Sequence, residues 1–374
     1  MHILYNIAGF YRPAGMERVL ADKANWLVAN GYRVSILTTE QKGRPYAFPL
    51  DERIEVRDLG IGYEDNNGAG LWDKLVHYPG KQLRHRKALE KVLKELKPDI
   101  TVSMFCNEVN LLPRIHDGSA KVLEVHFSRL KRLQYGRSGL WALVDRLRSR
   151  QDASLVKKYA RFVVLTQDDR RNWGAGENIR VIGNPVNFHP DRPAPLDSRV
   201  VLAVGRLTYQ KGLDRLLDAW KIAVAAAPGW KLMLAGDGEL RGELIKQAES
   251  LGVSDSVRFA GNVSDIAACY SNASIVALSS HYEGLPMVLL EAQAFGVPAV
   301  SFDCQCGPRE IIRDGVDGLL VKEGNVPALA SALRRIMLDD ALRLRMGAAA
   351  YEGARRWAPD TIMQQWTSLF EEIS

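Results

Sequence analysis

Short runs of apolar and β-branched residues alternate along the chain with longer segments in which apolar residues recur at helical spacing. In the first half, the short runs predict strands at residues 2–6, 33–38, 100–104, 121–126 and 162–166. Helical spacing fills the intervals, for example over residues 16–29 and 84–96. Strands that alternate with helices build parallel sheets covered by helices on both faces, so this half predicts an α/β domain.

The same alternation begins again near residue 200. Strands are predicted at residues 200–204, 231–235, 257–260, 274–278 and 299–302. Helices are predicted between them at residues 214–226, 239–251 and 286–295. The second half therefore predicts another α/β domain built on its own parallel sheet.

A segment rich in proline and polar residues, GNPVNFHPDRPAPLDSR, separates the two patterns and predicts an interdomain linker. We predict a first domain over residues 1–183, a linker over 184–199, a second domain over 200–356 and a final segment over 357–374. A helix from about Pro359 to Ile373 presents Trp366 and Phe370. We expect this helix to cross back onto the first domain.

Composition limits the class of protein. With 374 residues, 47% of them hydrophobic and 25% charged, the chain reads as a soluble globular protein of two domains. It has no uncharged apolar run long enough to span a bilayer, and its first residues show no basic leader or cleavage site. The cysteines are Cys106, Cys269, Cys304 and Cys306, and Cys304-x-Cys306 lacks a second pair or nearby histidines. We therefore expect a cytoplasmic protein with reduced thiols and no metal site.

The net charge of +6 is concentrated in two stretches. Residues 81–97 hold seven basic and two acidic residues, and residues 127–161 hold ten basic and two acidic residues. Such stretches suit phosphates, nucleic acid or an acidic membrane face, and they also suit solvated helix faces. No RRM, KH or helix-turn-helix signature supports nucleic acid.

The second basic stretch contains SGLWALVDRLRSR, in which an apolar stripe could lie beside arginines. The members of this stripe are Leu140, Trp141, Leu143, Val144 and Leu147. Such a stripe suits peripheral contact with anionic lipid. A helix packed on its own sheet would have the same composition, so both interpretations stay open.

The loops that follow predicted strands carry most of the unusual residues, and open α/β sheets bind ligands at that edge. Arg206 and Lys211 flank the loop after residues 200–204. A forked guanidinium and a point-charge ammonium suit a diphosphate, although two exposed surface cations would look the same. The loop has no Walker pattern.

Glycines occupy other loops of this kind. Gly15 precedes a predicted helix, and Gly236 and Gly261 follow two predicted strands of the second half. Glycine lets a ligand approach the backbone and a helix N-terminus, although each could be a simple turn residue. None belongs to a GxGxxG pattern, which argues against an NAD-dependent oxidoreductase.

The segment HYEGLPMVLLEAQAFG holds Glu283 and Glu291 in an otherwise apolar run. Pro286 fits the first position of a helix, which puts Glu283 on the preceding loop and Glu291 in the second turn. The unpaired amides of the first turn would lie between the two carboxylates. The alternative is a buried helix with one exposed glutamate at each margin.

Taken together, these motifs resemble those of the glycosyltransferases of family 4. The matching pieces are AGMERVL, EVHFS, GNPV, VGRLTYQKG, AGDGEL, FAG, HYEGLPMVLLE and GPREIIRDGVDGLLV, which span nearly the whole chain in the family's order. The glycine pair usual in the first loop is here Ala14-Gly15. The resemblance implies the GT-B fold, with two facing Rossmann-like domains and a C-terminal helix that crosses back to the first. It also implies retention of anomeric configuration, no metal or other cofactor, and a role in cell-surface polysaccharide synthesis.

The resemblance also implies roles for particular residues. Arg206 and Lys211 would hold the diphosphate of a sugar nucleotide, Glu291 the ribose hydroxyls, and Glu283 would face the donor sugar. The stretch that approaches the phosphates and sugar would be Gly284, Leu285, Pro286, Met287 and Val288, with Gly15, Gly236 and Gly261 as further substrate contacts. His126 would lie near the reacting centre, although a core histidine at a strand end would look alike.

The expected donor is UDP-N-acetylhexosamine, UDP-glucose or UDP-galactose, and the acceptor is a glycan or lipid-linked glycan. The absence of a D-x-D motif at a strand end agrees with a metal-independent reaction. The alternative of the same fold is a sugar-nucleotide epimerase or hydrolase, which would need further acid and base groups facing the sugar.

Overall fold

The computed structural model describes residues 1–374 except 67–70, 130–139 and 189. Side chains are also left undescribed at residue 66, within 71–76 and 140–145, and at 147. The chain divides into two compact units, which are described separately below. The first unit comprises Met1–Pro185 and Pro359–Ser374, and the second comprises Val186–Ala358.

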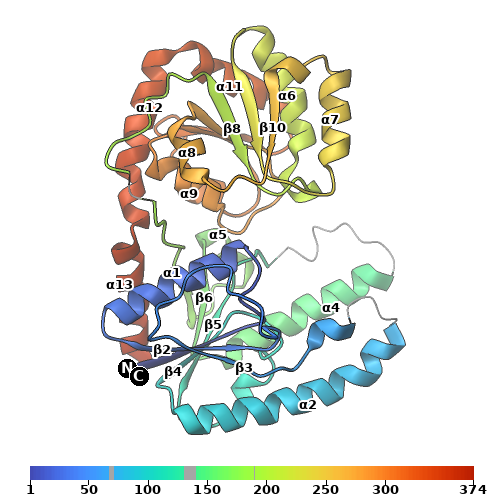
Figure 1. The fold of residues 1–374 in the computed structure, drawn as a ribbon, viewed down its shortest axis with the longest axis vertical. Helices are drawn as coiled ribbons and strands as arrows, with labels where there is room; N and C mark the ends of the chain where they lie inside the picture. Colours follow the sequence, from blue (N-terminus) through green and yellow to red (C-terminus); the bar gives the residue numbers. More distant parts are fainter. Residues whose placement is uncertain (67–70, 130–139, 189) are drawn as a thin grey trace. The chain divides into compact units, whose positions relative to one another are not determined.

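The first unit is built on a seven-stranded parallel sheet with the order β3-β2-β1-β4-β5-β6-β7 (Figure 1). The strands are β1 (His2–Ile7), β2 (Arg33–Thr38), β3 (Glu55–Asp58), β4 (Ile100–Ser103), β5 (Ala120–Glu124), β6 (Arg161–Val164) and β7 (Ile179–Val181). Every residue of β1 is buried, as expected for a central parallel strand covered on both faces. Strand β1 has β2 on one side and β4 on the other. Because the chain adds β2 and β3 on one side before it crosses to β4, the topological switch point lies between β1 and β4.

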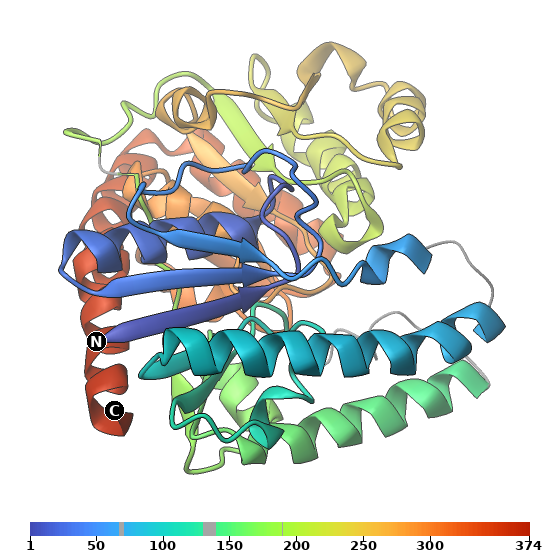
Figure 2. The same ribbon diagram turned by 60° about the horizontal axis from the view of Figure 1, so that its bottom comes forward.

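Helices cover both faces of this sheet. They are α1 (Gly15–Ala29), α2 (Leu71–Leu96), α4 (Leu140–Leu155), α5 (Gln167–Asn172) and α13 (Pro359–Ile373). Figure 2 shows α1 on one face and α2 and α4 on the other. Helix α13 packs against α1, and the indole of Trp26 donates to Asp360 at 2.7 Å. The predicted return of the last helix to the first domain is therefore confirmed.

The predicted start of the second helix is wrong. The spacing indicated a helix from residue 84, whereas α2 begins at Leu71 and runs through Pro79 and Gly80. Proline and glycine give no helical signal, so the sequence hides the first turns. The later part of α2 follows its pattern, because it buries Leu89, Leu93 and neighbouring apolar residues against the sheet.

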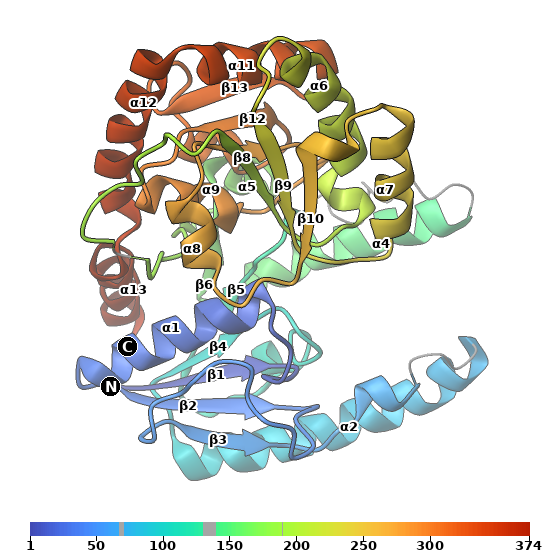
Figure 3. The ribbon, with the colours of Figure 1, turned by 45° about the horizontal axis from the view of Figure 1, so that its top comes forward.

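The second unit is built on a six-stranded parallel sheet with the order β10-β9-β8-β11-β12-β13 (Figure 3). The strands are β8 (Val200–Val204), β9 (Lys231–Ala235), β10 (Val257–Gly261), β11 (Ile275–Leu278), β12 (Ala299–Asp303) and β13 (Gly318–Lys322). The helices are α6 (Leu213–Ala225), α7 (Arg241–Ser250), α8 (Ile266–Ser271), α9 (Met287–Ala294), α10 (Pro308–Ile311), α11 (Val326–Leu338) and α12 (Asp340–Gly353). Here the switch point lies between β8 and β11.

The core of the second unit lies between its sheet and the helices α6 and α11, with Trp220, Leu333 and Phe302 among its fully buried residues. Side-chain caps fix where several helices begin. Asn325 accepts from the Ala328 amide at the start of α11, and Asp339 accepts from the Leu342 amide at the start of α12. The predicted pair of Rossmann-like parallel-sheet domains is confirmed.

The segment that the sequence predicted as a linker packs on the second unit from Val186 onward. The Ala194 amide donates to the Phe295 carbonyl at 2.8 Å, and the Tyr351 hydroxyl donates to the Pro190 carbonyl at 2.8 Å. Proline-rich composition indicates the lack of regular structure in this segment, but it carries no information about these contacts.

Candidate functional site

The loop over residues 205–212 joins β8 to α6 at the switch point of the second unit. Gly205 has φ 148°, and a Cβ there would lie 2.9 Å from the Lys211 side chain. Gly212 has φ 54°, and a Cβ there would lie 2.4 Å from the Ser279 carbonyl oxygen. The two glycines therefore let the loop fold back on itself and bring Lys211 over the strand end. Arg206 is exposed and has no side-chain partner among the residues that the structure describes.

Lys211 and Glu283 form an ion pair at this edge. Lys211 Nζ lies 2.8 Å from Glu283 Oε1, and the Ser280 hydroxyl donates to the same oxygen at 2.6 Å. The Glu283 side chain is 8% exposed and that of Lys211 is 17% exposed. The alternative of an exposed surface cation is therefore wrong for Lys211, whose ammonium lies beside a buried carboxylate.

The two loops that carry this pair are joined by further contacts. The His281 amide donates to the Gln210 carbonyl at 2.9 Å, and Gln210 Nε2 donates to the Tyr282 carbonyl at 3.2 Å. The rings of Tyr209 and His281 stack with their centroids 4.2 Å apart. The ammonium and carboxylate thus have fixed positions on a joined pair of loops rather than on two independent ones.

Helix α9 begins one residue later than predicted. Pro286 has φ −71° and ψ 100°, so it is the N-cap, and Met287 is the first helical residue. Glu283 still lies on the preceding loop and Glu291 in the second turn. Both glutamates are buried, so the alternative with an exposed glutamate at each margin is wrong.

Glu291 has a partner that the sequence did not reveal. The Tyr270 hydroxyl donates to Glu291 Oε2 at 2.6 Å, and both residues are buried. Tyr270 lies in α8, and its ring stacks on Phe295 at 5.5 Å between centroids. A tyrosine inside a short helix carries no motif, so only the three-dimensional fold identifies it as the residue that orients this carboxylate.

The stretch from Gly284 to Val288 forms the approach to α9. No side chain caps this helix, so its N-terminus is not occupied by a carboxylate or hydroxyl of its cap residue. Gly307 packs directly against the stretch, because a Cβ there would lie 2.4 Å from Pro286 Cδ and 2.9 Å from the Gly284 carbonyl oxygen. The arrangement leaves a helix N-terminus beside the Lys211–Glu283 pair, and such an end favours anions.

Of two predicted binding glycines, Gly236 is explained by backbone packing, whereas Gly261 is distinguished only by its positive φ. A Cβ at Gly236 would lie 2.0 Å from the Gly205 carbonyl oxygen, so no other residue fits without moving a loop. The Gly236 amide also donates to the Gly261 carbonyl at 2.8 Å. Gly261 has φ 66° and open space where a Cβ would be. Close packing of the loops after β8, β9 and β10 is sufficient to require Gly236.

In the first unit, Gly15 is the first residue of α1, and His126 lies on the loop after β5. Gly15 opens α1, and no atom lies within 4 Å of a Cβ placed there. His126 follows β5, and its Nε2 lies 3.0 Å from Glu124 Oε1 without the alignment of a hydrogen bond. The predicted strand over residues 121–126 is therefore two residues too long, since β5 ends at Glu124.

A buried carboxylate near the start of α1 was not predicted from the sequence. Glu17 is 8% exposed, and its Oε2 has no hydrogen-bond partner among the described residues. Burial raises the pKa of Glu17, against the opposing effect of Arg12 and His126. Glu17 belongs to the motif AGMERVL, but the sequence of this motif does not indicate that the side chain is buried.

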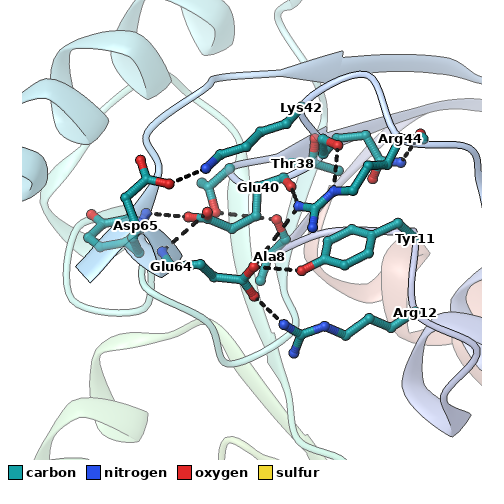
Figure 4. Close-up of polar contacts among 12 residues, drawn as sticks. Ala8, Tyr11, Arg12, Thr38, Glu40, Lys42, Arg44, Glu64 and Asp65 are labelled. Carbon is teal, nitrogen blue, oxygen red and sulfur yellow. Dashed lines mark hydrogen bonds and ion pairs between the residues drawn. The ribbon is translucent and has the colours of Figure 1, made fainter. Parts of the chain in front are cut away.

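A cluster of charged side chains joins the segments that follow β1, β2 and β3 (Figure 4). Glu64 accepts from the Tyr11 hydroxyl at 2.6 Å and from Arg12 Nη2 at 2.7 Å. The Arg44 guanidinium lies over the Tyr11 ring, 3.2 Å from its centroid. Lys42 pairs with Asp65 beside them. These contacts fix the rim of the first unit on that side of the switch point.

The basic stretch over residues 81–97 lies in α2. Lys81 and His85 are buried, whereas Arg84, Lys87 and Lys91 are exposed. The predicted apolar stripe falls on α4, whose backbone is helical there, but the side chains of the stripe lie outside the described residues. Within the described residues, no helix is long and apolar enough to cross a membrane, and no three metal-binding side chains cluster together.

Comparisons with known proteins give a consistent result. The chain is 29% identical to the amylovoran biosynthesis glycosyltransferase AmsD of Erwinia amylovora, over 98% of this chain and 99% of AmsD. It is 27% identical to an α-1,4-N-acetyl-D-galactosaminyltransferase of Campylobacter jejuni, over 96% and 95% of the two chains. The crystal structure of Anabaena HepE in complex with UDP aligns with a TM-score of 0.78 at 19% identity, covering all of both chains.

Two family models match successive parts of the chain. The one described as glycosyltransferase family 4 matches residues 13–189, and the one described as glycosyl transferases group 1 matches residues 187–353. The first match spans most of the first unit, and the second spans nearly all of the second unit. The chain therefore belongs to the glycosyltransferases of family 4.

Proposed function

We propose that this glycosyltransferase moves a hexosyl or N-acetylhexosaminyl group from a UDP-sugar to a glycan or lipid-linked glycan, with retention of configuration and without a metal ion. The observation that carries the proposal is the Lys211–Glu283 pair beside the uncapped N-terminus of α9. It combines a cation, a carboxylate and a helix end at the switch point of one sheet.

These groups suit the departure of a diphosphate. As the bond between sugar and diphosphate breaks, negative charge grows on the phosphate oxygens and positive charge grows on the sugar ring. Lys211, the exposed Arg206 and the amides at the start of α9 stabilise the negative charge. Glu283 lies next to Lys211 and stabilises the positive charge. The cations thus supply the charge that a metal ion provides in other transferases.

The nucleoside and the acceptor are assigned to other residues. Glu291, held by Tyr270, accepts hydrogen bonds from the ribose hydroxyls. The acceptor binds the first unit near Gly15 and His126. UDP as the nucleotide is supported by the complex of HepE with UDP, and a glycan acceptor by the Campylobacter relative, whose name specifies a diNAcBac-PP-undecaprenol oligosaccharide. The name of the Erwinia relative supports a role in polysaccharide synthesis.

A panel of sugar nucleotides tests the donor. We expect UDP and UDP-sugars to raise the melting temperature more than GDP- or ADP-sugars do, because ligands that bind only the folded state stabilise it. Transfer activity should persist in EDTA, and NMR of the product of an α-linked donor should show an α-linkage. Loss of activity in EDTA with recovery in Mg²⁺ would exclude the metal-independent reaction, and a β-linked product would exclude retention.

The exposed cations of α2 support a further part of the proposal, contact with an anionic membrane surface at the cytoplasmic face. We expect the protein to sediment with vesicles that contain phosphatidylglycerol and to be released at high salt. Vesicles of phosphatidylcholine are the control. Equal sedimentation with both would assign these cations to solvent alone.

A further inference from the structure

A lysine of the first unit is buried where a hydrophobic residue would be expected. Lys23 lies on the inner face of α1, and its side chain is 1% exposed. Its Nζ lies 2.8 Å from Oε1 and 2.7 Å from Oε2 of Glu124, the last residue of β5, whose side chain is also 1% exposed. Desolvation makes such a pair costly, and well-packed apolar residues are often as stable. Stability alone therefore does not explain why the fold contains it.

Glu124 has another neighbour. The same Oε1 that receives Lys23 lies 3.0 Å from His126 Nε2. Burial alone would raise the pKa of Glu124, but the interactions with Lys23 and His126 outweigh it and lower that pKa to about 2. The carboxylate is therefore ionised and fixed between the lysine and the histidine.

Helix α13 covers the Lys23 ammonium on the side away from Glu124. The Trp366 ring of α13 lies over the ammonium, with Nζ 3.5 Å from the ring centroid. Trp366 is fully buried, and the Tyr5 ring of β1 lies 5.5 Å from the same nitrogen. A cation over an indole face is attracted by the ring quadrupole, and the ring also excludes water. Water therefore cannot replace Glu124 as the partner of Lys23.

We propose that Trp366, Lys23 and Glu124 form a buried chain whose function is to position His126 for the transfer reaction. Glu124 fixes the orientation of the imidazole and favours the tautomer that carries its proton on Nε2, facing the carboxylate. Lys23 keeps Glu124 ionised, and Trp366 keeps Lys23 in place. These are positioning residues that act through His126, and the proposal rests on the proposed function for the catalytic role of His126.

Glu17 and Tyr5 are further titratable groups that interact with this buried cluster. On α1, Glu17 interacts electrostatically with His126, and burial raises its pKa. On β1, burial raises the pKa of Tyr5 well above its ordinary value, with Glu124 adding to the effect. Among the described residues, the carboxylate that pairs with the His126 ring is that of Glu124, whose Oε1 lies 3.0 Å from Nε2.

The test separates positioning from stability with four variants. Glu124→Gln removes the charge, Lys23→Met leaves the carboxylate unpaired, and the double variant removes both charges. Lys121→Met is the matched control. Lys121 lies on the same strand, is buried, and pairs with Asp117 and Ser119 at the opposite end of β5, away from His126.

We expect Glu124→Gln to lower kcat about 10- to 100-fold, because the neutral amide loses the electrostatic attraction that orients the imidazole. The double variant should recover the melting temperature of the wild type but keep the low kcat. Lys23→Met, if it folds, should gain activity as the pH rises, because its unpaired Glu124 ionises only at higher pH. Lys121→Met should keep the wild-type kcat. Recovery of kcat in the double variant would overturn the proposal.

A second measurement needs no substrate. The ¹⁵N shifts of the His126 ring report which nitrogen carries the proton. We expect the Nε2-protonated form in the wild type and in Lys121→Met, and a changed population in Glu124→Gln and in the double variant. An unchanged ring signature in all variants would overturn the proposal even if the enzyme is active. A protein that binds no sugar nucleotide would instead overturn the proposed function and leave this result standing.

Discussion

Each unit holds a lysine–carboxylate pair at nearly the same Nζ–O distance, but in opposite surroundings. Lys211 and Glu283 are 17% and 8% exposed at the rim of one sheet, whereas Lys23 and Glu124 are each 1% exposed beneath a helix of the other. An accessible cation can exchange its carboxylate for a phosphate, and a sealed one cannot. The comparison shows that the same ion pair can serve ligand binding or internal positioning, depending on whether its surroundings admit a ligand.

The largest expected effect concerns the sealed pair. Lys23→Met should destabilise the protein by about 3–5 kcal/mol, because it leaves a buried carboxylate without its cation. Lys211→Met should cost less, about 1–3 kcal/mol, since the Ser280 hydroxyl still donates to the buried Glu283 carboxylate. Urea unfolding of both variants measures the difference. Equal losses would break the distinction between the two pairs.

Acid should affect the first unit more strongly. Burial lowers the pKa of His85 to about 4, so the folded state favours the neutral ring. The neutral His85 ring therefore contributes about 3 kcal/mol to the free energy of unfolding. This contribution is present above pH 6.5, the ordinary pKa of histidine, and is lost as the pH falls toward 4. In the second unit, burial and Arg215 also lower the pKa of His281. Because this ring is only partly buried, we expect its protonation to cost less stability than that of His85.

Hydrogen exchange between pH 7 and 4 measures this contrast. We expect protection of the first-unit strands to fall before that of the second unit. His85→Gln should remove the part of the pH dependence that comes from this ring. Earlier loss of protection in the second unit would contradict the expectation.

Nucleotide binding should show an effect of intermediate size. Arg206→Ala and Lys211→Ala should each weaken UDP binding by about 1.5–3 kcal/mol, the range for hydrogen bonds to charged groups. Calorimetry measures the affinity, and a cooperative melting transition above the assay temperature excludes unfolding. Lys221→Ala, an exposed lysine of α6, is the control. Wild-type affinity in both loop variants would remove these residues from the site.

The smallest predicted difference divides the roles of the two glutamates. Glu291→Gln should raise the donor KM more than it lowers kcat, because a ribose contact is present in both the ground and transition states. Glu283→Gln should mainly lower kcat and leave UDP affinity nearly unchanged. Steady-state kinetics with calorimetry distinguishes them. Equal losses of UDP affinity would show that both carboxylates contact the nucleotide.

The sequence predicted the central strands because continuous apolar, β-branched runs mark strands buried on both faces. It missed β3, β7 and β13, which lie at sheet edges, and the first two are short and contain charged residues. Lys211 and Glu283 were identified separately, but their contact depends on how two loops fold over glycines. The Lys23–Glu124 pair was missed because a lysine in a helical pattern reads as a solvent-facing residue.

The first unit is made of two segments that are far apart in the chain, and this affects how the protein folds during synthesis on the ribosome. Residues 359–374 belong to this unit, although they follow the whole second unit in the chain. The second unit, residues 186–358, is contiguous and can complete its sheet while the chain is still being made. The first unit cannot be completed until α13 has been synthesised, and until then Lys23 lacks the Trp366 ring that covers its ammonium. The first unit therefore completes its folding only after the second unit and α13 have been translated.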